Sequence, residues 1–157
     1  MLPHYPRTPP RLGRILVDDP LYFVTICTFG RGRFLAEESV HRCFMQYCSE
    51  SYARRGAATG RYVIMPDHIH CFVRLPQGTK LGPWIGLLKQ ALTMHLRGIG
   101  RCPGPVWQRG FFDHVLRSSE SYAEKWEYVF NNPIRAGLVA KPEDWPFAGE
   151  IVHIDRA

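Results

Sequence analysis

Residues 58–75 read ATGRYVIMPDHIHCFVRL, and this stretch decides the fold. Residues 58–65 and 68–75 are both rich in the β-branched, aromatic and aliphatic residues that favour strands. Pro66-Asp67 stands between them, and both residue types favour turns. We therefore expect a hairpin-like pair of strands with a tight turn at Pro66-Asp67.

The second predicted strand begins His68-Ile69-His70. Alternate side chains of a strand point to the same face, so the two imidazoles should stand side by side while Ile69 turns into the core. Two adjacent imidazoles can hold one divalent metal ion. The pattern alone is weak, because seven histidines in 157 residues give roughly 0.3 such pairs by chance. A surface pair of histidines without a metal is the alternative.

The sequence on either side of the hairpin extends the fold. Upstream, residues 21–29 (LYFVTICTF) predict a strand, and apolar residues at helical spacing predict a helix over about 37–55. Downstream we expect a helix over 81–97, a strand over 106–117 with a bulge at Gly110, and a helix over 119–132 capped by Ser118 or Ser119. Pro133 should end or kink this last helix, with a short continuation over 134–139.

This order of elements predicts an α+β domain. Strand–helix–strand–strand–helix–strand, followed by a final helix, is the split-βαβ arrangement of ferredoxin-like folds, whose sheet is antiparallel. We expect a single domain over residues 15–145, because 157 residues suit one compact domain. Residues 1–14 are rich in proline and arginine and should form a flexible basic arm, and residues 146–157 should form a tail.

Composition and charge narrow the classes of function. No apolar run approaches the roughly 20 residues that span a bilayer, and the N-terminus lacks the apolar core of a secretory signal, so we expect a cytoplasmic protein with no membrane partner. The net charge is +6 and aromatic residues make up 13% of the chain. Cations that follow phosphates and rings that stack on bases are typical of proteins that bind single-stranded nucleic acid.

A second group of chemically useful residues lies in EKWEYVFNNP, residues 124–133. Tyr128 and Asn132 are four residues apart, so on a helix their side chains share one face. Pro133 lacks a backbone N–H and should place Asn132 in the final turn of that helix, where its amide oxygen could serve as a third metal ligand. The alternative is a core tyrosine beside an asparagine that caps the helix.

Both groups occur together in an order that resembles a known family. The segments YFVTICT, YVIMPDHIHCFVRLP, LKQALTMHL, VWQRGFFDHVLR and YVFNNPIRAGLV are similar to those of the single-tyrosine HUH transposases (IS200-like), and among them the REP-associated tyrosine transposases. The similar segments span about residues 21–140. The chain departs from the family at Asp67, where such proteins often carry asparagine, and this change could alter local charge or metal affinity.

The resemblance implies an HUH nuclease fold and a mechanism. His68, His70 and Asn132 would be the metal ligands, with Mg²⁺ or Mn²⁺ suited to mixed nitrogen and oxygen ligands. Tyr128, on the C-terminal helix, would attack a phosphodiester of single-stranded DNA and form a 5′-phosphotyrosine, which allows strand transfer without ATP. The expected substrate is DNA with a hairpin, as in REP elements, and the expected enzyme is a monomer or homodimer.

Further residues are candidates for DNA contacts. They are aromatic or polar side chains on or near the predicted elements: Lys89, Trp107, Gln108, Arg109, Phe112, Asp113 and Arg135. Core packing for Trp107 and one phenylalanine, and a solvated surface for Lys89, are equally good interpretations.

Three other functions remain open from sequence. A relaxase or replication initiator uses the same chemistry, often with a larger chain or two tyrosines, and here Tyr122 lies off the face of Tyr128. A binder of single-stranded RNA on a ferredoxin-like sheet should carry aromatic residues in place of His68 and His70. A domesticated transposase would bind DNA without moving it.

Overall fold

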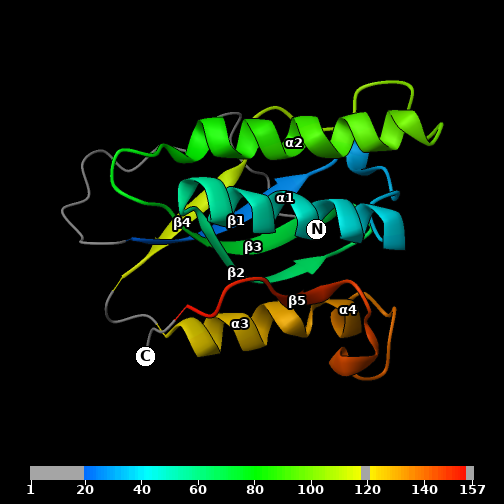
Figure 1. Cartoon of the computed structure of the whole chain (residues 1–157). Coiled ribbons are helices and arrows are strands. Elements are labelled where there is room, and N and C mark those ends of the chain that lie inside the picture. The colour runs from blue at the N-terminus through cyan, green and yellow to red at the C-terminus, as the bar shows by residue number, and fades with distance from the viewer. Residues whose placement is uncertain (1–19, 118–120, 155–157) are drawn as a thin grey trace.

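The computed structural model describes residues 20–117 and 121–154, so the predicted arm at residues 1–14 lies outside the described part. Within that part, five strands form one antiparallel sheet in the order β4-β1-β3-β2-β5 (Figure 1). The helices and strands are β1 Leu21–Cys27, η1 Phe29–Arg31, α1 Glu38–Arg55, β2 Ala58–Ile64, β3 His68–Arg74, α2 Leu81–Gly98, β4 Phe112–Leu116, α3 Tyr122–Phe130, α4 Asn132–Arg135, η2 Pro142–Asp144 and β5 Ala148–Glu150. The predicted α+β class and the antiparallel sheet are therefore confirmed.

The helices form a layer on each face of the sheet. Helices α1 and α2 cover one face, and α3 and α4 cover the other (Figure 1). Side chains of β3 alternate between the two: Ile69 packs with the α1–α2 core, whereas Phe72 packs with the α3 core. This alternation places His68 and His70 on the face that α3 and α4 cover, because residues two apart on a strand point the same way.

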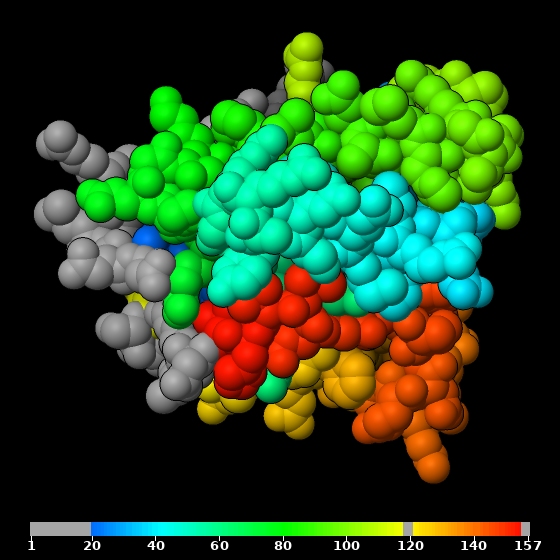
Figure 2. All heavy atoms as spheres, viewed as in Figure 1, coloured from blue at the N-terminus to red at the C-terminus, as the bar shows by residue number. Residues whose placement is uncertain are grey.

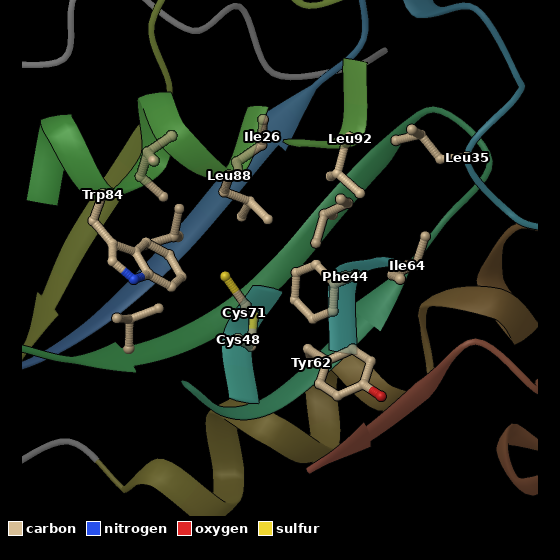
Figure 3. Close-up of a cluster of buried hydrophobic side chains, with 14 of the residues drawn as sticks. Ile26, Leu35, Phe44, Cys48, Tyr62, Ile64, Cys71, Trp84, Leu88 and Leu92 are labelled. Carbon is tan, nitrogen blue, oxygen red and sulfur yellow. The ribbon is translucent and has the colours of Figure 1, made fainter. Parts of the chain in front are cut away.

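The larger core lies under α1 and α2. Phe44 and Cys48 of α1 meet Trp84, Leu88 and Leu92 of α2 over the sheet, and all five side chains are buried (Figure 3). Burial of this apolar surface is the main stabilising contribution to the fold, at about 25 cal/mol per Å². The core fixes the sheet that carries the two histidines.

The hairpin of β2 and β3 forms as expected. Ile64 pairs with Ile69, and the Met65 amide donates to the His68 carbonyl at 2.8 Å, which closes a tight turn around Pro66-Asp67. Strand β1 lies on the other side of β3, where Thr25 is opposite His70 and Cys27 is opposite His68. The two histidines therefore lie on the central strand of the sheet.

The predicted tail at residues 146–157 is wrong for its described part. Residues 148–150 form β5, which pairs with β2 at the edge of the sheet, and Ile154 is buried in the α3 core. In the space-filling view the C-terminal segment, in red, lies against α1 (Figure 2). A short strand such as AGE carries too few β-forming residues to be visible in the sequence, and it forms because β2 offers an open edge.

Two other expected elements differ in extent. The strand predicted over residues 106–117 is only Phe112–Leu116, because Trp107 makes an isolated bridge to Thr28 and Gly110 has a positive φ of 76°. The helix predicted over residues 119–132 begins after its Ser121 cap and ends at Phe130. Ser118 and Ser119 lie outside the described residues. In the described ranges no helix combines the length and apolar character needed to cross a membrane.

Candidate metal centre and nucleophile

His68 and His70 lie side by side on β3, as the sequence predicts. Their ring centroids are 4.7 Å apart and the rings meet edge to face. Both side chains are only partly accessible to solvent. Two imidazoles at this spacing, on a rigid central strand, can bind one ion.

His70 is held by its neighbours on β1. Its Nδ1 lies 2.8 Å from Thr25 Oγ1, and the Phe23 ring stacks on it with centroids 5.3 Å apart. With Nδ1 occupied by this hydrogen bond, the lone pair available to a metal is on Nε2. Burial lowers the pKa of His70 well below its usual value, so the ring is neutral at neutral pH. Further lowering comes from the positive charge of neighbouring groups, those of His68, Arg135, Lys125 and Arg31.

His68 has contacts at both ring nitrogens. Nδ1 lies 2.7 Å from Asp67 Oδ1, and Nε2 lies 3.4 Å from Asn132 Nδ2. Burial raises the pKa of the Asp67 carboxyl, but hydrogen bonds and charge from His68 and Arg31 outweigh burial and keep that pKa below its usual value. Asp67 is therefore a carboxylate, and its Oδ1 can accept a hydrogen bond from the N–H at His68 Nδ1.

Asn132 reaches the histidines from the first position of α4. The sequence placed it in the last turn of one continuous helix, and this is wrong: Asn131, with φ −83° and ψ 1°, separates α3 from α4. Pro133, buried in the second position of α4, has no amide to continue the α3 hydrogen bonds. The bend still brings Asn132 next to His68.

Tyr128 lies on α3, one turn before Asn132, with 64% of its surface exposed. The Arg135 guanidinium lies over its ring at 4.0 Å from the centroid. An exposed phenol can reach a bound strand. Tyr122, by contrast, is 3% exposed, and its hydroxyl accepts a hydrogen bond from the Arg61 amide at 2.9 Å. Its position excludes it as a nucleophile for an external substrate.

The donor set fits a divalent metal ion. In the described ranges no three His, Cys, Asp or Glu side chains converge, so a third protein ligand would have to be of another type. Asn132 supplies one, if its amide presents Oδ1 to the ion in place of Nδ2. Two imidazole nitrogens and one amide oxygen, with open positions for phosphate oxygens, suit Mg²⁺ or Mn²⁺.

Two of the residues proposed for DNA contacts have internal roles. Trp107 Nε1 donates to Thr93 Oγ1 at 2.9 Å, and its ring packs against the main core. Lys89 Nζ donates to the carbonyl oxygens of Gln108 and Gly110 at 3.1 and 2.5 Å. These two side chains therefore hold the segment before β4 against α2.

The remaining candidates differ in their exposure to solvent. The Gln108 amide donates to the Cys27 carbonyl at 2.9 Å, and Phe112 and Asp113 are partly buried on β4 beside β1. Arg109 and Arg135 are exposed. The two arginines keep the expected accessibility for phosphate contacts.

Sequence reasoning missed three residues of this site. Thr25 and Arg31 contact the histidine shell from β1 and η1, and Lys125 Nζ lies 5.0 Å from the centroid of the Phe23 ring that stacks on His70. Only the pairing register of β1 with β3 brings Thr25 to His70, and no local motif marks it. Lys125 could have been found, because it is three residues before Tyr128 on the same helix face.

The chain is similar in sequence to known transposases. The family model described as "Transposase IS200 like" matches residues 17–132. A REP-associated tyrosine transposase of Escherichia coli is 32% identical over 89 residues, a match that covers 55% of this chain and only half, 50%, of that protein. A putative REP-associated tyrosine transposase of Haemophilus influenzae is 30% identical over 142 residues, covering 82% of this chain and 78% of that protein.

Solved structures show the same fold. The structure of a REP-associated tyrosine transposase bound to a REP hairpin superposes with a TM-score of 0.69 at 22% identity, over 88% of this chain and 81% of that chain. A putative transposase from Deinococcus radiodurans gives a TM-score of 0.54 at 16% identity, over 77% of this chain and 96% of that chain.

Proposed function

This chain belongs to the IS200-like transposases, in the group of REP-associated tyrosine transposases, and on that premise we propose that it cleaves single-stranded DNA through a covalent bond to Tyr128. The observation that carries the proposal is the contact between His68 and Asn132. These residues are 64 positions apart in the sequence, and Asn132 lies one helical turn after an exposed tyrosine, Tyr128. A folding role alone does not require two adjacent imidazoles, an amide and an exposed phenol in one place.

The reaction conserves the number of phosphate ester bonds. Tyr128 Oη attacks phosphorus and the bond from phosphorus to O3′ breaks. The phenolic proton is transferred, directly or through water, to the leaving O3′ atom, which becomes a free 3′-hydroxyl. The product is a 5′-phosphotyrosine, which another 3′-hydroxyl can attack to release Tyr128 and join a new strand. Joining therefore needs no ATP, which suits strand transfer better than hydrolysis.

His68, His70 and Asn132 would hold the metal ion. When bound, the ion supplies positive charge that offsets the negative phosphate oxygens in the transition state. Thr25 and Asp67 orient the two imidazoles, and the side chains of Lys125 and Arg135 add positive charge around His70. An anionic strand is therefore attracted to the side of α3 that carries Tyr128.

We infer that the substrate is single-stranded DNA with a hairpin. The related structure bound to a REP hairpin supports this substrate, as does the net charge of +6.

The test is incubation of the protein with end-labelled single strands that carry imperfect hairpins, in Mn²⁺, followed by denaturing electrophoresis. The proposal predicts a slow species that survives SDS and disappears on protease treatment, and mass spectrometry should place the nucleotide on Tyr128. Addition of a strand with a free 3′-hydroxyl should convert this adduct into a longer DNA. Cleavage without any adduct would contradict the proposal and indicate hydrolysis by water.

A further inference from the structure

We propose that Arg31 and Asp67 form a positioning pair that holds the His68 imidazole with its proton on Nδ1 and its Nε2 lone pair available to the metal. The inference rests on the proposed function, because it takes His68 as a metal ligand. Neither residue would touch the ion or the DNA, and both would act through His68.

The contacts of His68 Nδ1 decide the proton position. Asp67 Oδ1, at 2.7 Å, can only accept a hydrogen bond, whereas Arg31 Nη2, at 3.5 Å, can only donate one. Asp67 therefore favours a protonated Nδ1, whereas Arg31 favours an unprotonated one. The carboxylate is much closer and charged, so its contact dominates and Nδ1 carries the proton. In a neutral ring, Nε2 is then left with the lone pair that metal binding requires.

Arg31 holds the Asp67 carboxylate in the orientation that favours the proton on His68 Nδ1. Its Nε donates to Asp67 Oδ2 at 3.1 Å, so the carboxylate accepts one hydrogen bond on each oxygen, from Arg31 and from His68. Arg31 Nη1 also contacts Cys27 Sγ at 2.8 Å, on the strand that pairs with His68. The guanidinium therefore has a defined orientation against both neighbours of the histidine.

The backbone conformation around Arg31 directs its side chain toward Asp67. Arg31 has a φ of 58°, in the left-handed region that costs a non-glycine residue roughly 1–2 kcal/mol. Thr28, fully buried, ties the same loop to the hairpin turn: its amide donates to the Asp67 carbonyl at 3.0 Å and its hydroxyl to the Gly32 carbonyl at 2.9 Å. A glycine would fit this backbone conformation without strain, so the fold accepts a local cost where it places the Arg31 side chain against Asp67.

Three variants test the pair: Asp67→Ala, Arg31→Gly and the double variant. The control is Arg33→Gly, which removes the same charge from an exposed position of the same loop. Mn²⁺ affinity is measured by the electron paramagnetic resonance signal of the free ion. The proton position on His68 is measured without metal, by long-range ¹H–¹⁵N correlation spectra of histidine-labelled protein. Thermal melting monitors folding, and Arg31→Gly should melt within a few degrees of wild type because it removes the backbone strain.

The pair predicts a definite pattern. Wild type and Arg33→Gly should show the Nδ1–H form of His68, whereas Asp67→Ala should lose it and bind Mn²⁺ about 10–100-fold more weakly. Arg31→Gly should weaken binding by a smaller factor. The double variant should bind no more weakly than Asp67→Ala alone, because Arg31 acts through Asp67.

Two results distinguish failure of the positioning pair from failure of the proposed metal site. Unchanged Mn²⁺ affinity and an unchanged His68 proton position in Asp67→Ala and Arg31→Gly would overturn the positioning pair and leave the proposed function standing. A wild-type protein that binds no Mn²⁺, yet loses the Nδ1–H form in Asp67→Ala, would overturn the metal site of the proposed function and support the pair.

Discussion

Replacement of Lys89 by methionine distinguishes an internal role for this lysine from a role in DNA binding. The ammonium group donates to two carbonyl oxygens, those of Gln108 and Gly110. Burial also lowers the pKa of Lys89, as expected for a group enclosed between α2 and the segment before β4. Methionine keeps the packing of the aliphatic stem and removes only the donor.

The expected loss follows from these contacts. A hydrogen bond to a charged group contributes roughly 1.5–3 kcal/mol, and the two carbonyls can regain part of that by binding water. We therefore expect Lys89→Met to lower the free energy of unfolding by about 2 kcal/mol and the Tm by about 4–8 °C. Affinity for a hairpin strand and its salt dependence should hardly change, because the ammonium is already occupied.

The assay pairs thermal melting with fluorescence anisotropy of a labelled hairpin strand over a salt series. The matched control is Lys80→Met, the same change at an exposed lysine at the start of α2, which should leave the Tm unchanged. An unchanged Tm for Lys89→Met, together with a log–log salt slope shallower by about 0.7, would refute the reasoning and assign Lys89 to a phosphate.

Three further predictions concern the metal centre and the strand. His68→Ala or His70→Ala should abolish metal-dependent cleavage but leave binding of the hairpin strand largely intact, and Asn132→Ala should have a milder effect because a neutral amide is the weakest ligand. A cleavage gel and an anisotropy titration measure these effects, and full cleavage by His68→Ala in Mg²⁺ would contradict the ligand assignment. Thr25→Val keeps the side-chain volume and removes the hydroxyl that hydrogen-bonds His70 Nδ1, so Mn²⁺ affinity should fall about 10-fold or more. Unchanged affinity in calorimetry would show that His70 does not need this hydrogen bond to bind the ion. Affinity for a hairpin strand should fall with a log–log salt slope of about −0.7 per neutralised phosphate, and equal affinity for plain duplex over the same titration would count against single-strand recognition.

The histidine pair and the fold class could be predicted because they depend on local periodicity. A strand alternates its side chains whatever its surroundings, so the shared face of His68 and His70 follows from their spacing of two. The turn at Pro66-Asp67 is equally local. These features together place His68 and His70 on one face of a predicted strand before any tertiary contact is known.

Long-range pairing explains what the sequence did not reveal. Thr25 meets His70 across 45 residues and Arg31 meets Asp67 across 36, through strand register and a left-handed turn that no local pattern specifies. The same reason applies to β5, a short strand that forms only because β2 has an open edge. Pro133 predicts an end or a kink in the last helix, but helical spacing did not show that the break falls at Asn131, two residues earlier.

The most direct test of the account is adduct formation by Tyr128→Phe. This change deletes one oxygen from a side chain that is 64% exposed, so folding and DNA affinity should be preserved while the nucleophile is lost. The control is Tyr52→Phe, the same deletion at an exposed tyrosine of α1. With a labelled hairpin strand in Mn²⁺, wild type and Tyr52→Phe should give an SDS-resistant, protease-sensitive adduct, and Tyr128→Phe should give none. An adduct of undiminished yield from Tyr128→Phe would contradict the account and place the nucleophile elsewhere in the chain.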